Sequence, residues 1–398
     1  MLHEQAADRT RAWLSTRRTL GAHPRVSIRD GGYGLPVKIV IAAWHLKNPT
    51  VGLGRYAREL IEAIGRVDSA NEYEILMPEA EHQFTSRPNI RYKVIRFPLF
   101  RRRFWEQVAH LRAGSYDLLH FPYDSCAAWT RGKFVTTIHD AKPLLFPELR
   151  SKVNLNARIE QLLVGDRRAK IDHVITSSDS SRRDLIQQLE LPTGRITAVP
   201  LGIDSSRFHP VSPAQVGAER PYVMSLAGSD PTKNIINLVR AFAAVPEYLG
   251  QIYDLVLVGD VSKREDVRAA IEREGIASRT RLAGVVSDDA LIRLYQGATV
   301  FVFPSLYEGF GLPVLEAMAC GCPVVCSDTS SLPEVAGDAA VLVDPRDVEH
   351  ISAQLVHVLE SPLVRADMKE RGRARALDFP WERTARETID VYRRVVNS

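Results

Sequence analysis

Residues Pro304–Glu316 read Pro-Ser-Leu-Tyr-Glu-Gly-Phe-Gly-Leu-Pro-Val-Leu-Glu and form the most informative segment of the chain. They follow an apolar run at Ala298–Phe303, which predicts a buried strand, and they lead into a helix expected at Val314–Ala319. Pro313 is tolerated in the first turn of that helix because its missing N–H has no helical partner there. A strand, a glycine-containing loop and a helix in succession indicate an α/β sheet that carries this loop at its carboxyl edge.

The loop in this stretch predicts an anion site. Backbone N–H groups at a helix start have no partner inside the helix and lie at the positive end of its dipole, so they bind phosphate well. The expected phosphate-binding residues are Gly309, Phe310, Gly311 and Leu312.

Two carboxylates flank this anion site. Glu308 precedes the loop and Glu316 lies eight residues later, about a turn into the helix. A carboxylate is repelled by phosphate, so we expect both to accept hydrogen bonds from sugar hydroxyls. Phosphate and sugar in one place indicate a nucleotide-sugar site.

The same residues resemble the retaining glycosyltransferases of family 4. Glu308 and Glu316 match the E-x7-E motif of that family, and the block from Val302 to Pro345 carries the most specific part of the resemblance. A thinner similarity runs from about Lys38 to the C-terminus. The resemblance implies the GT-B fold, in which two Rossmann-like, doubly wound α/β domains face each other across a cleft and a C-terminal helix crosses back.

Composition bounds the class of protein. A chain of 398 residues is long enough for two domains, and 45% hydrophobic with 25% charged residues is typical of a globular protein. The net charge of +4 does not indicate a nucleic-acid binder. The sequence contains no run of about 18 or more apolar residues that would predict a membrane span, and its first residues lack a signal-peptide pattern. We therefore expect a cytoplasmic protein, with contact at the inner face of the membrane left open.

Short apolar strands alternate with helices along the chain, which predicts mostly parallel sheets. The pattern restarts after a Pro- and Ser-punctuated stretch that ends at Pro221. We predict an N-terminal extension at 1–36, with a possible amphipathic helix at Ala6–Leu20, and an acceptor-binding domain at 37–209. A nucleotide-sugar-binding domain at 210–380 and a crossover helix at 381–398 follow.

Candidate residues in the N-terminal domain lie after its predicted strands. Gly52 and Gly54 form a glycine-rich turn expected to face the donor phosphates, although a plain tight turn explains the glycines equally well. His139 ends the strand Phe134–Ile138, in a Thr-Ile-His-Asp stretch that is similar to the family's T-x-H-D. The resemblance implies that His139 contacts the donor sugar or lies near the reacting centre; a structural histidine is the alternative. Asp140 is expected to cap a turn or helix.

Candidate donor-binding residues in the C-terminal domain are Ser229, Lys233, Asn234 and Val286. Lys233 lies in the first strand-to-helix turn, where a cation can neutralise a diphosphate. The resemblance implies an arginine and a lysine in this loop, but only Lys233 matches, so Arg55 or another side chain would have to supply a second cation. By resemblance, the loop containing Val286 carries the nucleobase platform.

The remaining motifs predict little chemistry. The cluster Arg101, Arg102, Arg103, Phe104 and Trp105 is expected to be a solvated helix start, with weak contact to anionic lipid as the alternative. Cys320, Cys322 and Cys326 are too closely spaced for a zinc site, so we expect no metal and, with Cys126, no disulfide.

We therefore predict a retaining, metal-independent glycosyltransferase without a cofactor. It would transfer a hexose from GDP-mannose or a UDP-hexose to a hydroxyl acceptor such as a lipid-linked or polysaccharide glycan. His139 and Glu308 would serve the reacting centre, with Glu308 positioning the sugar and Glu316 holding the ribose. A non-catalytic nucleotide-sugar-binding subunit of the same fold and a phosphorylase-like enzyme are the alternatives.

Overall fold

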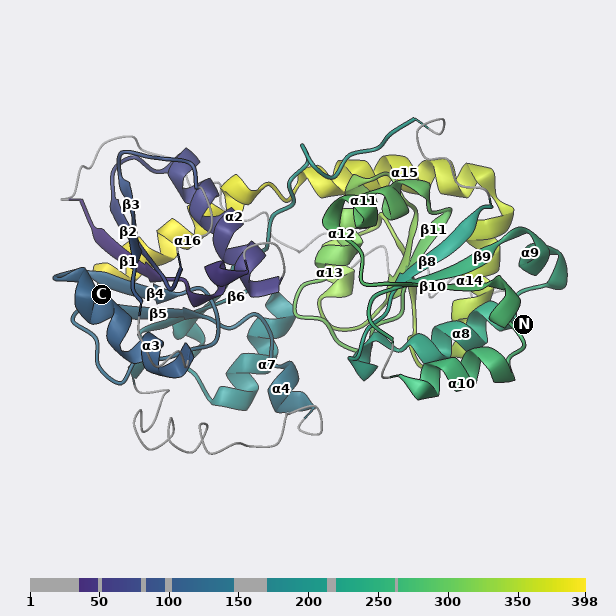
Figure 1. Ribbon diagram of the computed structural model, residues 1–398, viewed down its shortest axis with the longest axis horizontal. Helices are drawn as coiled ribbons and strands as arrows, with labels where there is room; N and C mark the ends of the chain where they lie inside the picture. The colour runs from purple at the N-terminus through teal and green to yellow at the C-terminus, as the bar shows by residue number, and fades with distance from the viewer. Residues whose placement is uncertain are drawn as a thin grey trace, which may run out of the picture. The chain divides into compact units, whose positions relative to one another are not determined.

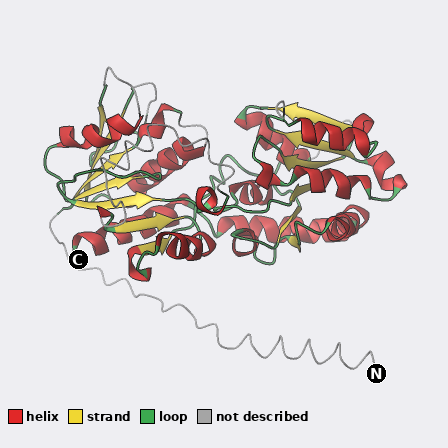
Figure 2. Cartoon of the chain, turned by 90° about the horizontal axis from the view of Figure 1, so that it is seen from below, coloured by secondary structure: helices red, strands yellow, loops and turns green. Residues whose placement is uncertain are grey.

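The computed structural model describes residues 36–48, 52–79, 84–96, 102–146, 170–212, 220–261 and 264–398. Nearly all of the extension at 1–36 lies outside these ranges, together with Arg101, so neither a loosely attached extension nor the alternative helix at Ala6–Leu20 is tested. Two parallel sheets with helices packed on them make up the described chain (Figures 1 and 2).

The N-terminal sheet is parallel throughout and has the order β3-β2-β1-β4-β5-β6-β7. Its strands are β1 Lys38–Ala42, β2 Glu72–Met77, β3 Ile90–Val94, β4 Leu118–Phe121, β5 Lys133–Thr137, β6 His173–Thr176 and β7 Ile196–Ala198. Its described helices are α2 Gly52–Val67, α3 Arg102–Val108, α4 Lys142–Leu145 and α7 Asp179–Leu189, with 3-10 helices η2 Trp44–Lys47, η3 Ala109–Ala113 and η5 Thr193–Arg195.

The C-terminal sheet is also parallel, in the order β10-β9-β8-β11-β12-β13. Its strands are β8 Tyr222–Leu226, β9 Asp254–Val258, β10 Thr280–Gly284, β11 Val300–Phe303, β12 Val324–Ser327 and β13 Val341–Val343. The helices are α8 Ile235–Ala243, α9 Glu247–Ile252, α10 Glu265–Arg273, α11 Asp288–Gly297, α12 Leu312–Ala319, α13 Leu332–Ala336, α14 Val348–Glu360, α15 Pro362–Leu377 and α16 Trp381–Val396, with 3-10 helices η7 Pro231–Lys233 and η8 Ala277–Arg279.

The central strands, such as β11, are apolar because both of their faces are covered, whereas the edge strands β3 and β10 carry polar residues and are partly exposed. In β11, Val300 and Val302 belong to the core cluster that contains α8, α10 and α14, whereas Phe301 and Phe303 belong to the cluster that contains α11 and α12. Successive strand residues point to opposite faces, so a fully buried strand must be apolar at every position. This explains why the sequence predicts the strands of both sheets so closely.

The helix α16 returns to the N-terminal sheet, as predicted, and packs against α2 (Figure 1). Arg66 Nε pairs with Glu382 Oε1 at 2.7 Å, and Tyr392 OH lies 2.6 Å from His120 Nδ1. Just before α16, the N–H of Ile203 donates to the carbonyl of Phe379 at 2.8 Å. The chain segment that leads from the first sheet to the second therefore lies beside the segment that leads back.

The two-sheet architecture and the crossover helix are confirmed, and the strands predicted at Ala298–Phe303 and Phe134–Ile138 agree with β11 and β5 within two residues. The three-residue strand β7 was not predicted, because it is short and contains a polar residue, Thr197. The helix α2 begins at Gly52, so both glycines of the predicted glycine-rich turn lie in its first turn.

Candidate active site

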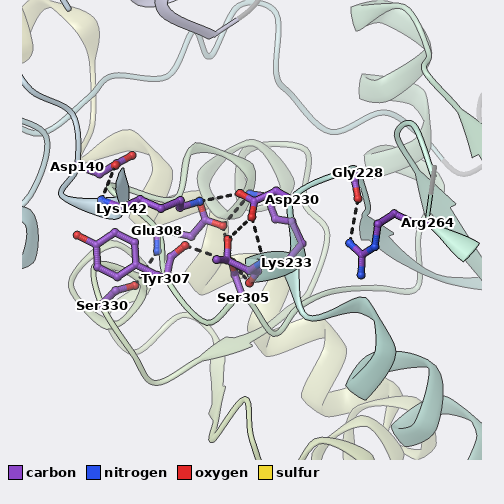
Figure 3. Close-up of polar contacts among 11 residues, drawn as sticks. Asp140, Lys142, Gly228, Asp230, Lys233, Arg264, Ser305, Tyr307, Glu308 and Ser330 are labelled. Carbon is purple, nitrogen blue, oxygen red and sulfur yellow. Dashed lines mark hydrogen bonds and ion pairs between the residues drawn. The ribbon is translucent and has the colours of Figure 1, made fainter. Parts of the chain in front are cut away.

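The candidate site lies where the strand order of the C-terminal sheet reverses, between β8 and β11. In open α/β sheets, ligands bind outside the carboxyl ends of the strands at such a point. The loop after β8 carries Lys233 and the loop after β11 carries Glu308, and their side chains meet there (Figure 3).

Short hydrogen bonds fix the loop after β11. The N–H of Leu306 donates to the carbonyl of Thr232 at 2.7 Å, and the side-chain amide of Asn234 donates to the carbonyls of Pro304 and Pro345 at 3.0 and 2.6 Å. Asn234, predicted to bind the donor, therefore holds two neighbouring loops together through its side chain. Its left-handed conformation (φ 58°) is one that asparagine tolerates.

Lys233 and Glu308 form an ion pair with a distance of 2.7 Å between Nζ and Oε1. The hydroxyl of Ser305 donates to the same carboxylate oxygen at 2.5 Å, and the Lys233 ammonium lies 4.7 Å from the centre of the Phe303 ring. The N–H of Glu308 donates to the hydroxyl of Ser330 at 3.0 Å. The structure thus brings together the residues expected to bind diphosphate and sugar.

Gly309, Phe310 and Gly311 lead into α12. This helix begins at Leu312, two residues before the predicted start, and Pro313 lies in its first turn, as predicted. Gly311 has a φ of 108°, which favours glycine. No acceptor among the described residues lies on the N–H of Phe310 or of Gly311.

A second ion pair links the two sheets, because Arg55 of α2 meets Glu316 of α12. Arg55 Nη1 lies 2.7 Å from Glu316 Oε1, and Tyr295 OH lies 3.3 Å from Glu316 Oε2. Burial alone would lower the pKa of Arg55, but the Glu316 carboxylate outweighs it and raises that pKa. Arg55, considered from the sequence as a second cation, therefore neutralises the carboxylate predicted to bind ribose.

A third ion pair involves Lys142 of α4, which the sequence did not single out. Its Nζ lies 2.9 Å from Oδ2 of Asp230, in the loop between β8 and Lys233. Burial would lower the pKa of Lys142, but the carboxylates of Glu308 and Asp230 raise it overall. Lys142 follows the Thr-x-His-Asp stretch by two residues, and only the assembled fold could reveal that it meets the other sheet.

His139 follows β5, and its ring packs edge-on against that of Tyr56, with centroids 4.4 Å apart. One ring nitrogen bonds to the backbone of Pro122, which has no N–H, so the carbonyl accepts and this nitrogen carries the proton. The other nitrogen, Nε2, is buried and has no partner among the described residues. Burial lowers the pKa of His139 to about 4, so the ring is neutral and Nε2 is a bare acceptor at neutral pH.

The remaining residues predicted from the sequence lie in several different parts of the structure. A Cβ at Gly54 would lie 2.0 Å from the Asn48 carbonyl oxygen, so this glycine allows close approach of the chain's own backbone. Gly52 starts α2 with a φ of 51°. Ser229 is exposed in the loop after β8, and Val286 precedes Ser287, whose hydroxyl caps α11. Asp140 accepts the N–H of Lys142 at 2.8 Å in the turn that precedes α4, which agrees with the predicted turn cap.

The basic cluster was expected to be a solvated helix start, with lipid contact as the alternative, and both interpretations were wrong at Trp105. Trp105 is 1% exposed and donates its indole N–H to the carbonyl of Ile95, so it cannot touch a bilayer. Arg102 pairs with the buried Glu106 at 2.9 Å, and Phe104 is half exposed. Among helices in the described ranges, none is long and apolar enough to cross a membrane.

The four cysteines are buried thiols without disulfide bonds. Burial raises the pKa of Cys322 and of Cys326 to about 12, so both stay protonated. Across the part of the chain that the structure describes, no three His, Cys, Asp or Glu side chains are grouped so as to hold a metal ion.

Comparison with known proteins gives the same class as the fold and the site. Residues 212–375 match the model of glycosyl transferases group 1, and residues 51–207 match that of glycosyltransferase family 4. O-antigen chain mannosyltransferase B of Escherichia coli is 33% identical over 387 residues, which cover 90% of this chain and 100% of that protein. The chain therefore belongs to family 4 of the glycosyltransferases, and its two-sheet architecture is the GT-B fold.

Two further proteins are similar to this chain. The MMP alpha-(1->4)-mannosyltransferase of Mycolicibacterium hassiacum is 33% identical over 57% of this chain and 55% of its own length. The solved sucrose-phosphate synthase of Thermosynechococcus elongatus superposes with a TM-score of 0.71, at 22% identity, over 90% of this chain and 99% of that one. At this identity the structural match concerns the fold alone.

Proposed function

We propose that this chain is a retaining, metal-independent mannosyltransferase that uses a nucleoside-diphosphate mannose and a sugar hydroxyl as acceptor. The names of two relatives support mannose as the sugar. GDP-mannose is the first donor to test, and a UDP-hexose is the alternative. A lipid-linked or polysaccharide glycan would supply the hydroxyl.

The observation that carries the proposal is the Lys233–Glu308 pair beside the loop that leads into α12. A diphosphate leaving group gains negative charge as its bond to the sugar breaks. Lys233 and the N–H groups of Phe310 and Gly311 would stabilise this charge. Lys142 would add a second cation once it leaves Asp230, and this would complete neutralisation without a metal ion.

The remaining polar groups divide between sugar and nucleoside. Glu308 would exchange Lys233 for a hydroxyl of the donor sugar, and the bare Nε2 of His139 would accept a hydrogen bond from another. Glu316 would accept a ribose hydroxyl while it keeps Arg55, since a carboxylate has lone pairs for both. Glu308 therefore orients the sugar and forms no covalent bond to it.

The proposed reaction balances without an outside base. The acceptor oxygen forms a bond to the anomeric carbon on the same face from which the phosphate oxygen departs. The acceptor proton passes to the departing phosphate oxygen, and the products are an α-linked glycoside and a nucleoside diphosphate. Configuration at the anomeric carbon is retained.

The test is to incubate the protein with GDP-mannose, UDP-glucose and UDP-galactose in excess EDTA and to follow release of sugar by NMR. We expect slow hydrolysis of GDP-mannose, with the α anomer appearing first, and no loss of rate on chelation. Glu308→Ala is the matched control and should release no sugar.

Other outcomes would contradict the proposal. A β anomer appearing first would contradict retention, and a rate restored only by Mn²⁺ would contradict metal independence. Nucleotide binding without turnover, with any glycan acceptor tried, would favour a non-catalytic subunit. Release that requires inorganic phosphate would favour a phosphorylase.

A further inference from the structure

Three serine side chains at the start of α7 converge on the backbone of the two segments that carry the candidate site. Ser178 Oγ and Ser181 Oγ lie 2.6 and 3.0 Å from the carbonyl oxygen of Gly309. Ser177 Oγ lies 2.7 Å from the carbonyl oxygen of His139 and 3.0 Å from that of Gly309. All three serines are at most 2% exposed, so water does not compete for these bonds.

The number of hydroxyl protons indicates which serine donates to which backbone carbonyl. A carbonyl oxygen has two lone pairs and a serine hydroxyl has one proton. Ser178 and Ser181 therefore fill the two acceptor positions of Gly309, and Ser177 donates to the nearer carbonyl of His139. Ser178 Oγ also accepts the N–H of Ser181 at 3.0 Å, which caps α7. In this arrangement each of the three serine protons has a backbone carbonyl as its acceptor.

Fixing the Gly309 carbonyl also fixes the next N–H. In a trans peptide, the C=O of Gly309 and the N–H of Phe310 point in opposite directions. The N–H of Phe310 is therefore directed away from α7, and it has no acceptor among the described residues. A Cβ at Gly309 would lie 2.7 Å from the carbonyl oxygen of His139, so only glycine allows this close approach.

Contacts that do not involve the three serine hydroxyls also hold α7 against residues of the C-terminal sheet and its loops. The carboxylate of Glu334 accepts the N–H groups of Asp179 and Ser180 at 3.0 and 2.9 Å. The hydroxyl of Tyr307 donates to Asp184 Oδ2 at 2.8 Å. Loss of one serine hydroxyl therefore leaves the docking of α7 in place and frees only the peptide that the hydroxyl oriented.

We infer that Ser178 and Ser181 are positioning residues for sugar transfer. They aim the N–H of Phe310 at the oxygen of the departing diphosphate, while Ser177 keeps the backbone of His139 in register with the same loop. The inference rests on the proposed function, because it assigns the Phe310 N–H to a charge that develops only during transfer. Sequence reasoning from the loop alone could not find it, since the three serines belong to the other sheet.

The test measures kcat and KM for transfer from GDP-mannose with three proteins: the wild type, Ser181→Ala and Ser180→Ala. Ser180 lies on the same turn and bonds to Glu334 through its backbone, which alanine retains. We expect Ser181→Ala to lower kcat by about 10- to 100-fold, as for a misaimed transition-state donor, with KM changed by less than about 3-fold. Ser180→Ala should keep the wild-type kcat.

Two variants at Ser178 test the same inference if Ser181→Ala does not fold. Ser178→Gly also removes a hydroxyl, but glycine starts a helix with little loss of stability, and Ser178→Thr keeps the donor. We expect Ser178→Gly to lower kcat and Ser178→Thr to restore it toward the wild-type value. If the wild type turns over and both donor-removing variants match Ser180→Ala, the positioning role is overturned and the proposed function stands. If the wild type turns over no nucleotide-sugar, both are overturned.

Discussion

Removing either member of the Lys233–Glu308 ion pair should affect nucleotide binding in opposite ways. In the structure the two side chains are bonded at 2.7 Å and are 22% and 11% exposed. If the diphosphate binds Lys233, it must replace the carboxylate as the partner of this ammonium. Glu308→Ala therefore removes a competitor for the diphosphate, whereas Lys233→Ala removes the group that binds it.

The size of each effect follows from the kind of bond. A hydrogen bond to a charged group contributes about 1.5–3 kcal/mol, so Lys233→Ala should weaken binding of GDP by about 10- to 150-fold. Glu308→Ala should leave GDP affinity unchanged or raise it by up to about tenfold, the lower end of the same range. The same variant should abolish transfer, since the sugar loses its positioning carboxylate.

Titration calorimetry with GDP, and separately with GDP-mannose, measures both affinities on the same proteins. Glu308→Gln is the matched control, because it removes the charge and keeps the shape of the side chain. It should bind GDP as Glu308→Ala does. If Glu308→Ala binds GDP as poorly as Lys233→Ala, the diphosphate does not compete with Glu308 and the assignment of the two loops is wrong.

Three further predictions concern buried ionisable groups. Arg55→Met leaves the Glu316 carboxylate buried without its cation and should destabilise the protein by about 3–5 kcal/mol in urea unfolding, whereas the double variant with Glu316→Leu should recover most of this; an additive double variant would contradict the pairing. Glu316→Gln should weaken GDP binding by about 1.5–3 kcal/mol in calorimetry, and unchanged affinity would exclude a ribose contact. Burial lowers the pKa of His120 to about 3 and of His139 to about 4, so the unfolded chain binds more protons below pH 6.5. Stability should fall on acidification from about pH 6.5 toward pH 4 by up to about 1.4 kcal/mol per pH unit for each histidine, and a His120→Asn variant that keeps the wild-type slope would contradict this.

The sequence predicted the fold well because the signals for buried parallel strands are local. A run such as Val300–Phe303 must be apolar on both faces, and this is visible without knowing its neighbours. The loop after it was predicted for the same reason, since Gly311 and Pro313 mark a helix start within a few residues.

The partners of the site residues could not be predicted, because they come from the other sheet. Nothing local to Glu316 indicates Arg55, which lies 261 residues earlier, and nothing local to Asp230 indicates Lys142. Trp105 was assigned to a surface because it follows a basic cluster, although an indole with a backbone acceptor nearby is well placed in a core. The partners of these residues are set by contacts between segments far apart in the chain, and a single sequence does not show which distant segments meet.

The return of α16 to α2 has a consequence for synthesis of the chain. Arg66 and Glu382 are 316 residues apart, and buried residues of α16 such as Tyr392 complete the core that α2 begins. A ribosome must therefore translate the whole C-terminal sheet before the N-terminal sheet can close its core. Until then, the apolar face of α2 is uncovered, and such nascent species bind chaperones or aggregate. The C-terminal sheet, whose strands and covering helices are contiguous between residues 222 and 377, can fold first although it is made second.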